Sequence, residues 1–303
     1  MLELYKQTIK TTFKMIRLFK TIAVFITFVS LISCGGSGTT ETPIDSTEVK
    51  SSIDTSKSVV FYNIPSPLET FTILKMSGSA FDKSVLNPTD KMPKYISSFS
   101  KAANLGVYST DLSFCYLYKQ NQDFNNYLKN INELTNALSI DGSYGQEVNK
   151  RLQANSTNLD SLMAIVTEAG INADQYLKDN QRNTATATIA AGGWVEAMYI
   201  VASIADKTQK EEVIGLVGDQ KIVLKNLMNM LEQFKADEEI NTLLVGMQDI
   251  ASVYENVQAS QDKPITSDKD IISVGKNTSF KLSQDQLKSI LEKVTVLRYK
   301  ITL

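Results

Sequence analysis

From residue 68 onward, apolar residues recur at every third or fourth position, with charged or amide side chains between them. This periodicity is typical of amphipathic helices that pack by one face. No proline interrupts the chain between Pro93 and Pro264, which suits long helices joined by short turns. We therefore predict an all-α fold, a bundle or array of about seven to eight long antiparallel helices in a single domain over residues 58–303. The apolar stripes are Leu128, Ile131, Leu134 and Leu138; Leu152, Leu159, Leu162 and Val166; Leu224, Leu227, Leu231 and Phe234; Leu243, Met247, Ile250, Tyr254 and Val257; and Leu287, Ile290, Val294, Leu297 and Ile301.

Polar stretches between the stripes predict where helices begin and end. Candidate turns are Asp141-Gly142, Gly170-Ile171-Asn172 and the polar run over 205–210. Ser283 and Gln286 have the spacing of a capping box, which predicts the start of the final helix.

Three segments depart from the helical pattern. The stretch 63–67, Asn-Ile-Pro-Ser-Pro, is expected to be extended, because proline restricts its own backbone and that of the residue before it. Residues 264–282 predict a hairpin or an ordered loop. The C-terminal stretch 294–303 is rich in β-branched residues, so the alternatives to a regular final helix are a frayed end or a strand.

The segment from Asn183 to Ala205 is unusual because Glu196 is the only charged residue among its 23 positions. Its first half is made of small residues, which let helix backbones approach closely, and its second half carries Trp194 and other bulky side chains. We interpret this segment as the central buried helix of the bundle. A transmembrane helix is the alternative, which the weakly hydrophobic first half disfavours.

The N-terminus predicts export and a lipid anchor. Residues 22–32 form an uncharged, mainly apolar run of 11, which is too short to span a bilayer and suits the core of a signal peptide over residues 1–33. The following Leu31-Ile32-Ser33-Cys34 resembles the lipobox of bacterial lipoproteins. That resemblance implies that Cys34 carries acyl chains, including palmitate, and becomes the N-terminus after cleavage. The alternative is an ordinary secretory signal with a nearby cysteine.

The composition after Cys34 agrees with an anchored protein. Of the 23 residues from Gly35 to Lys57, 13 are Ser, Thr or Gly, so residues 34–57 are expected to be a flexible tether. Without the leader, 26 basic and 32 acidic residues leave a net charge of −6. Because nucleic-acid binding needs a basic surface, we expect a membrane partner through acylated Cys34 and no nucleic-acid partner.

Histidine is absent from the whole chain, and this absence excludes several kinds of chemistry. A Ser-His or Cys-His nucleophile, a histidine zinc site and an imidazole proton shuttle are all impossible. Cys115 has no second thiol to pair with if Cys34 is acylated, and it lies in an aromatic-rich stretch that favours a buried, unreactive thiol.

Two carboxylates within apolar helices are the sharpest chemical candidates. Glu196 lies in the segment described above, and Asp111 shares a helix face with Tyr108 and Cys115. Two inward carboxylates could serve as an acid–base pair or bind a divalent cation. The alternative that we favour is structural, with each carboxylate binding a buried polar group. We therefore predict a buried polar site of Tyr108, Asp111, Trp194 and Glu196, and no catalytic residue, metal or cofactor.

Three stretches together resemble a family of uncharacterised helical lipoproteins from Bacteroidota, over roughly residues 58–205. They are residues 63–69, residues 104–108 with Asp111, and residues 192–196 with Tyr199. The resemblance implies a place in the bacterial cell envelope, with the outer membrane as the expected location, and implies no catalytic residue.

These observations lead to one main hypothesis and two alternatives for function. The main hypothesis is a non-enzymatic, lipid-anchored domain that binds another envelope component or a small ligand. One alternative is a cell-surface carbohydrate-binding lipoprotein, which would need Trp194 and tyrosines to be exposed. The other is a carboxylate-dependent enzyme that uses Asp111 and Glu196.

Overall fold

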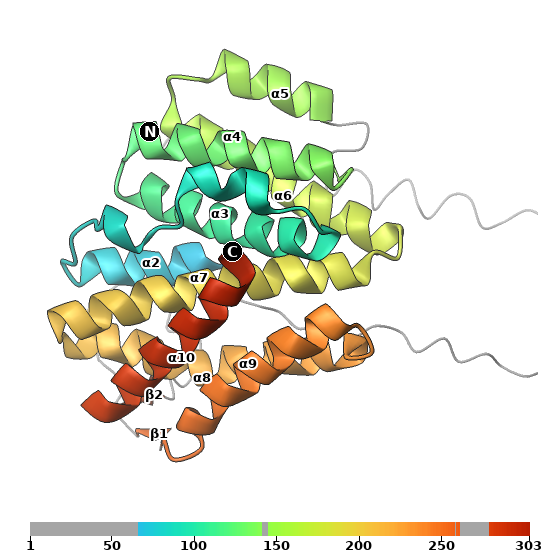
Figure 1. Cartoon of the computed structure of the whole chain (residues 1–303). Coiled ribbons are helices and arrows are strands. Elements are labelled where there is room, and N and C mark those ends of the chain that lie inside the picture. The colour runs from blue at the N-terminus through green and yellow to red at the C-terminus, as the bar shows by residue number, and fades with distance from the viewer. Residues whose placement is uncertain (1–65, 141–144, 258, 261–278) are drawn as a thin grey trace, which may run out of the picture. The chain divides into compact units, whose positions relative to one another are not determined.

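Helices make up most of the described chain, which covers residues 66–140, 145–257, 259–260 and 279–303 of a computed structural model (Figure 1). The prediction of an all-α fold is confirmed. Seven of the α-helices in these ranges, α3, α4 and α6–α10, span at least 17 residues each. The α-helices are α2 (Pro67–Met76), α3 (Ser98–Leu117), α4 (Asn121–Ala137), α5 (Gly145–Ala154), α6 (Leu159–Asp179), α7 (Asn183–Thr208), α8 (Glu211–Leu231), α9 (Glu238–Tyr254) and α10 (Gln284–Thr302).

Short elements connect these helices. Three 3-10 helices are η1 (Lys83–Val85), η2 (Thr89–Lys94) and η3 (Glu232–Phe234). The two-residue strands β1 (Ala259–Ser260) and β2 (Ser279–Phe280) pair antiparallel, and they flank a segment whose prediction as a hairpin or loop lies mainly outside the described residues. The described residues all belong to one compact unit, Ser56–Leu303. The predicted leader and tether, the turn at Asp141-Gly142 and residues 63–65 of the predicted extended stretch also lie outside the described residues.

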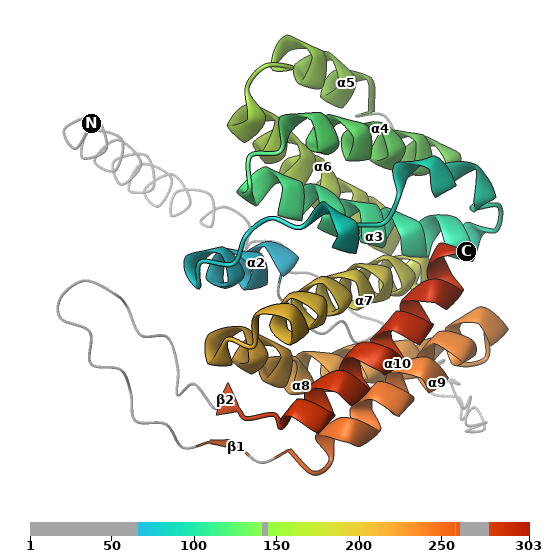
Figure 2. The same cartoon turned by 60° about the vertical axis from the view of Figure 1, so that its left-hand side comes forward.

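α7 is the central helix of the fold. It packs against α2, α3, α6, α8 and α10, and in two views it lies between the group α3–α6 and the group α8–α10 (Figure 1 and Figure 2). Within the described chain it is the one helix long and apolar enough to cross a membrane, yet 78% of its most apolar stretch is buried inside the fold. This burial confirms the prediction of a central core helix.

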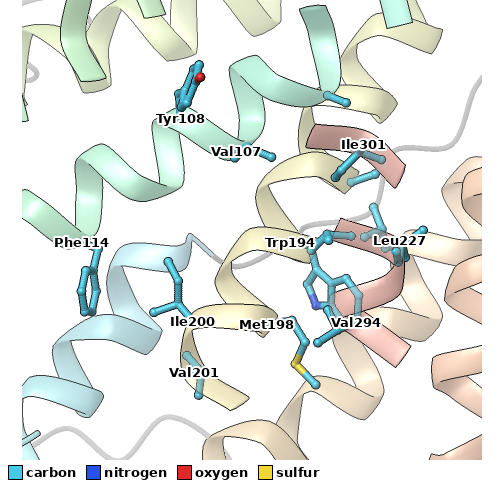
Figure 3. Close-up of a cluster of buried hydrophobic side chains, with 14 of the residues drawn as sticks. Val107, Tyr108, Phe114, Trp194, Met198, Ile200, Val201, Leu227, Val294 and Ile301 are labelled. Carbon is cyan, nitrogen blue, oxygen red and sulfur yellow. The ribbon is translucent and has the colours of Figure 1, made fainter. Parts of the chain in front are cut away.

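The main core forms where α7 meets α3, α8 and α10. Figure 3 shows Met198 and Trp194 of α7 near Leu227 of α8 and Val294 of α10, all of them buried. Apolar burial of this kind is the main source of fold stability. Leu227 and Val294, which belong to two of the predicted stripes, therefore point into this core.

Small residues bring α3 and α7 into backbone contact. A Cβ on Gly192 would lie 2.0 Å from the carbonyl oxygen of Ala103, and a Cβ on Gly106 would lie 2.0 Å from that of Ile189. No larger residue fits at these two positions without moving a backbone. The small-residue half of α7 therefore permits the close approach that its composition predicts.

Two predicted boundaries on α5 and α6 are wrong. The stripe from Leu152 to Val166 is divided between two helices, because Asn158 is the N-cap of α6 and accepts a hydrogen bond from the backbone N–H of Ser161 at 3.0 Å. The predicted turn at Gly170-Ile171-Asn172 is instead the middle of α6. An interior glycine costs a helix only about 1 kcal/mol, which the packing of Leu177 and other inward residues of α6 can offset.

α2 and α10 test the predictions for the proline-containing stretch and for the final helix. Pro67 is the first residue of α2, so the extended backbone ends at Ser66, which caps the helix. α10 begins with the predicted capping box of Ser283 and Gln286. It continues to Thr302, which shows that the strand alternative for its β-branched end is wrong, because Val294 and Ile301 are buried on its inward face.

Candidate functional site

Glu196 is fully buried in α7 and forms an ion pair with Arg298 of α10. The guanidinium donates two hydrogen bonds of 2.6 Å, from Nε to Oε2 and from Nη2 to Oε1 of Glu196. Nη2 also donates to the carbonyl oxygen of Val85 at 3.2 Å, and the guanidinium carbon lies 4.1 Å from the ring centre of Tyr199. Two parallel hydrogen bonds of this kind offset the desolvation cost of a buried carboxylate. The Glu196–Arg298 ion pair therefore ties α7 to α10, and Arg298 ties α10 to η1.

The ion pair also determines the charge state of its arginine. Burial by itself lowers the pKa of Arg298, because a desolvated cation is unfavourable. The adjacent Glu196 carboxylate outweighs that effect, and the pKa of Arg298 is raised above its ordinary value. Arg298 therefore remains a cation inside the fold.

Asp111 of α3 is also fully buried and lies beside this ion pair. Its Oδ2 accepts a hydrogen bond from the backbone N–H of Asn87 at 3.3 Å, and its Oδ1 has no donor among the described residues. Burial raises the pKa of Asp111 well above its ordinary value, and the negative charge of Glu196 raises it further. A protonated Asp111 can hydrogen-bond to Glu196, which favours the same state. The structure thus brings these two carboxyl groups together.

Tyr108 joins this region through the segment between η1 and η2. Its hydroxyl donates to the carbonyl oxygen of Pro88 at 3.0 Å, and the hydroxyl of Tyr127 donates to the carbonyl oxygen of Asn87 at 2.8 Å. Nδ2 of Asn87 donates to the hydroxyl of Tyr95 at 3.0 Å. These buried bonds fasten residues 87–89 against α3 and α4, so the tyrosines serve the fold.

Trp194 does not belong to this polar cluster. Two residues apart on a helix, Trp194 and Glu196 lie on nearly opposite sides of α7. The indole Nε1 donates to Oε1 of Gln220 in α8 at 3.0 Å, and the residue is only 4% exposed. The structure therefore brings together three of the four residues of the predicted site and separates Trp194. It also leaves Trp194 unavailable as an exposed platform for a sugar ring.

Cys115 is a buried free thiol, as the sequence predicts. Burial raises the pKa of the Cys115 thiol, and the neighbouring carboxyl groups of Asp111 and Asp123 raise it further. Because only the thiolate is a strong nucleophile, this thiol is unreactive. Among the described residues, no group of three Asp, Glu or Cys side chains is placed to hold a metal ion. Cys34 lies outside the described residues.

An open space lies elsewhere, beneath α6, and we call it the α6 cleft. It has two adjoining halves, one of about 260 Å³ that reaches α4 and α5, and one of about 340 Å³ that reaches α2 and Trp194. Its lining is mainly apolar, which is typical of small-ligand sites. The residues that line both halves are Ser109, Val166, Gly170, Ile189 and Ala190.

Sequence reasoning missed two features of these regions. Arg298 has a detectable signal, because it lies four residues after Val294 and three before Ile301, at the edge of the apolar stripe of α10. The sequence signal for the α6 cleft is weaker. It consists of small residues at helical spacing along one face of α7, namely Thr186, Ala190, Gly193 and Ala197. Small residues at such spacing fit either a close backbone contact or an open space, and only the position of α6 decides between them.

Comparison of the chain with known protein families, with curated proteins and with solved structures found no match. The arguments for function therefore rest on the two regions described above: the buried polar cluster of Asp111, Glu196 and Arg298, and the α6 cleft.

Proposed function

We propose that this chain is a lipid-anchored binding protein of the bacterial envelope, with the outer membrane as its expected location, and that it is not an enzyme. The observation that carries the proposal is the α6 cleft, whose two halves measure about 260 and 340 Å³. An apolar cavity of about 150 Å³ is enough to bind benzene, so either half can hold a small molecule. The ligand would sit between α6 and the floor formed by α3 and α7.

The positions of the carboxylates support binding over catalysis. Asp111 and Glu196 are the strongest candidates for acid–base chemistry, and both are fully buried. Neither lines the α6 cleft. Glu196 is already bound by Arg298, so a substrate would have to displace a bidentate ion pair to reach it.

The anchor is the second part of the proposal, and it is supported by the sequence around Cys34. The resemblance of the three sequence stretches to helical lipoproteins of Bacteroidota implies the same location. Several acyl chains give stable membrane attachment, and a flexible tether would let the helical domain move near the membrane surface.

A labelling experiment tests the anchor. Cells that express the full chain are grown with radioactive palmitate, and the membrane and soluble fractions are compared. We expect Cys34→Ala to lose the label and to leave the membrane fraction. Cys115→Ala is the matched control and should keep both, because Cys115 is a buried thiol of the core. Label that persists in Cys34→Ala would show that the anchor is wrong.

A further inference from the structure

We infer that the α6 cleft binds a neutral, elongated apolar molecule that carries one hydrogen-bonding group, such as an alkyl alcohol or ester. This inference rests on the proposed function and specifies its ligand class. Three observations on the lining residues carry it: their charge, an unpartnered hydroxyl, and the space beside a glycine of α6.

The charge of the lining excludes a buried anionic group. None of the described residues that line the two halves is basic. The one charged side chain among them is Asp174, whose Oδ2 already lies 2.6 Å from Nζ of Lys178. A carboxylate or phosphate placed inside the cleft would therefore lose its hydration without gaining a cation, which is costly. A neutral ligand avoids that cost.

Thr186 supplies the site for one polar group. It lines the half of the cleft near α5 and is only 9% exposed, and its buried Oγ1 has no hydrogen-bond partner among the described residues. Several helical threonines bond back to the preceding turn, as Thr188 does by donating to the carbonyl oxygen of Thr184 at 2.8 Å. A buried hydroxyl without a partner costs about 1–3 kcal/mol. A ligand hydroxyl or carbonyl beside Thr186 would remove this cost.

A glycine in the middle of α6 borders both halves of the cleft. Gly170 is an exposed residue at the edge of the cleft, four residues after Val166 and three before Ala173, which both line it. A Cβ on Gly170 would meet no atom within 4 Å, whereas a Cβ on Gly192 would lie 2.0 Å from the backbone of α3. A side chain at position 170 therefore has room at the edge of the cleft, whose two adjoining halves of about 260 and 340 Å³ can hold an alkyl chain.

The test uses the full chain, purified in detergent, and its single tryptophan as the reporter. Trp194 lines the cleft near α2, so a bromoalkyl probe bound there quenches its fluorescence. The probes are a bromoalkyl alcohol and the bromoalkyl carboxylate of equal chain length. We expect the alcohol to quench Trp194 at roughly tenfold lower concentration than the carboxylate.

Gly170→Phe is the blocking variant, because the ring fills the cleft, and it should abolish quenching by the alcohol. Gly215→Phe is the matched control: Gly215 lies within α8, a Cβ there also meets nothing within 4 Å, and the residue lines neither half of the cleft. Its quenching should equal that of the wild type. Circular dichroism of all three proteins checks that they fold.

Thr186→Val is the second variant, and it tests the polar group without closing the cleft. Loss of one hydrogen bond should weaken binding of the alcohol by roughly three- to tenfold. If the carboxylate quenches as well as the alcohol, and Gly170→Phe blocks both, the ligand class is wrong while the proposed binding function stands. Two outcomes would show that both the inference and the binding function are wrong. Either neither probe quenches Trp194 in the wild type, or the alcohol quenches Trp194 in Gly170→Phe as strongly as in the wild type.

Discussion

α7 has two faces that the fold uses in opposite ways. On one face, Glu196 is sealed against α10 by two 2.6 Å hydrogen bonds from Arg298. On the other, Thr186 and Ala190 border an open cleft, and within the described part of the chain the hydroxyl of Thr186 has no hydrogen-bond partner. The face with the chemically stronger group is therefore closed by an ion pair, while the face made of weakly reactive residues borders the cleft.

This difference distinguishes polar groups that stabilise the fold from polar groups that are placed to bind a ligand. A buried charge that is fully paired holds helices together and leaves no hydrogen-bonding position free for a substrate. A buried hydroxyl that is unpaired beside a cleft reduces stability unless something binds to it. In this protein the prominent carboxylates serve the fold, and the inconspicuous threonine marks the candidate ligand site.

The largest expected effect on stability comes from breaking the ion pair between Glu196 and Arg298. Arg298→Met removes the cation and leaves Glu196 as an unpaired buried charge. We expect the free energy of unfolding to fall by about 3–5 kcal/mol, measured by urea denaturation. The double variant Glu196→Leu with Arg298→Met should recover much of that loss, since it leaves no charge behind. A single-variant loss below about 1 kcal/mol would show that the pair is solvated and weak.

A smaller effect is expected from two glycines that differ only in what they face. Gly192→Ala places a Cβ 2.0 Å from the carbonyl oxygen of Ala103, so we expect a loss of about 1–3 kcal/mol in unfolding free energy. Gly170→Ala meets open space in the cleft, and we expect it to stabilise the protein by about 0.5–1 kcal/mol, because alanine is the better helix former. Equal effects at the two positions would contradict the distinction between the closed contact and the open cleft.

The pH dependence of stability gives the subtlest comparison. The pKa of Asp111 is raised well above 3.8 by burial and by Glu196. Its folded state therefore binds a proton more tightly than the unfolded state, so the stability that it contributes is fully present below pH 3.8 and is lost as the pH rises through the folded pKa. Asp111→Asn mimics the protonated form. Relative to the wild type, it should gain stability as the pH rises, in unfolding curves measured from pH 4 to 9.

Asp82→Asn is the control of opposite sign. The pKa of Asp82 is lowered to about 2 by its hydrogen bond to Lys207, so its contribution is present above pH 3.8 and is lost as the pH falls. This variant should be less stable than the wild type near neutral pH and equal to it near pH 2. If both variants shift in the same direction, the two carboxyl groups do not differ in environment as the structure indicates.

Much of the fold could be predicted because helical periodicity is a local property of the chain. The stripes of α4, α8, α9 and α10 and the capping box at Ser283 depend on residues a few positions apart. The turn wrongly predicted at Gly170 shows the limit of such reasoning. Glycine favours a turn only locally, and the packing of the whole inward face of α6 outweighs that preference.

The candidate sites were predictable only in part. The burial of Asp111, Glu196 and Cys115 followed from their apolar surroundings in the sequence. The partner of Glu196 did not, because Arg298 is 102 residues away along the chain. Trp194 was grouped with Glu196 by closeness in sequence, although the helix rotates by about 100° per residue and turns the two side chains apart.

By itself, the sequence determined the helical class, the central place of residues 183–205 and the expectation of an anchor at Cys34, because each depends on composition or short-range spacing. The tertiary structure decided which buried charges neutralise each other and where space remains between helices. Both outcomes depend on how distant helix faces meet: α10 brings a cation to Glu196, and α6 stays far enough from α7 to leave a cleft. No local pattern contains that information, since it arises only when the helices pack.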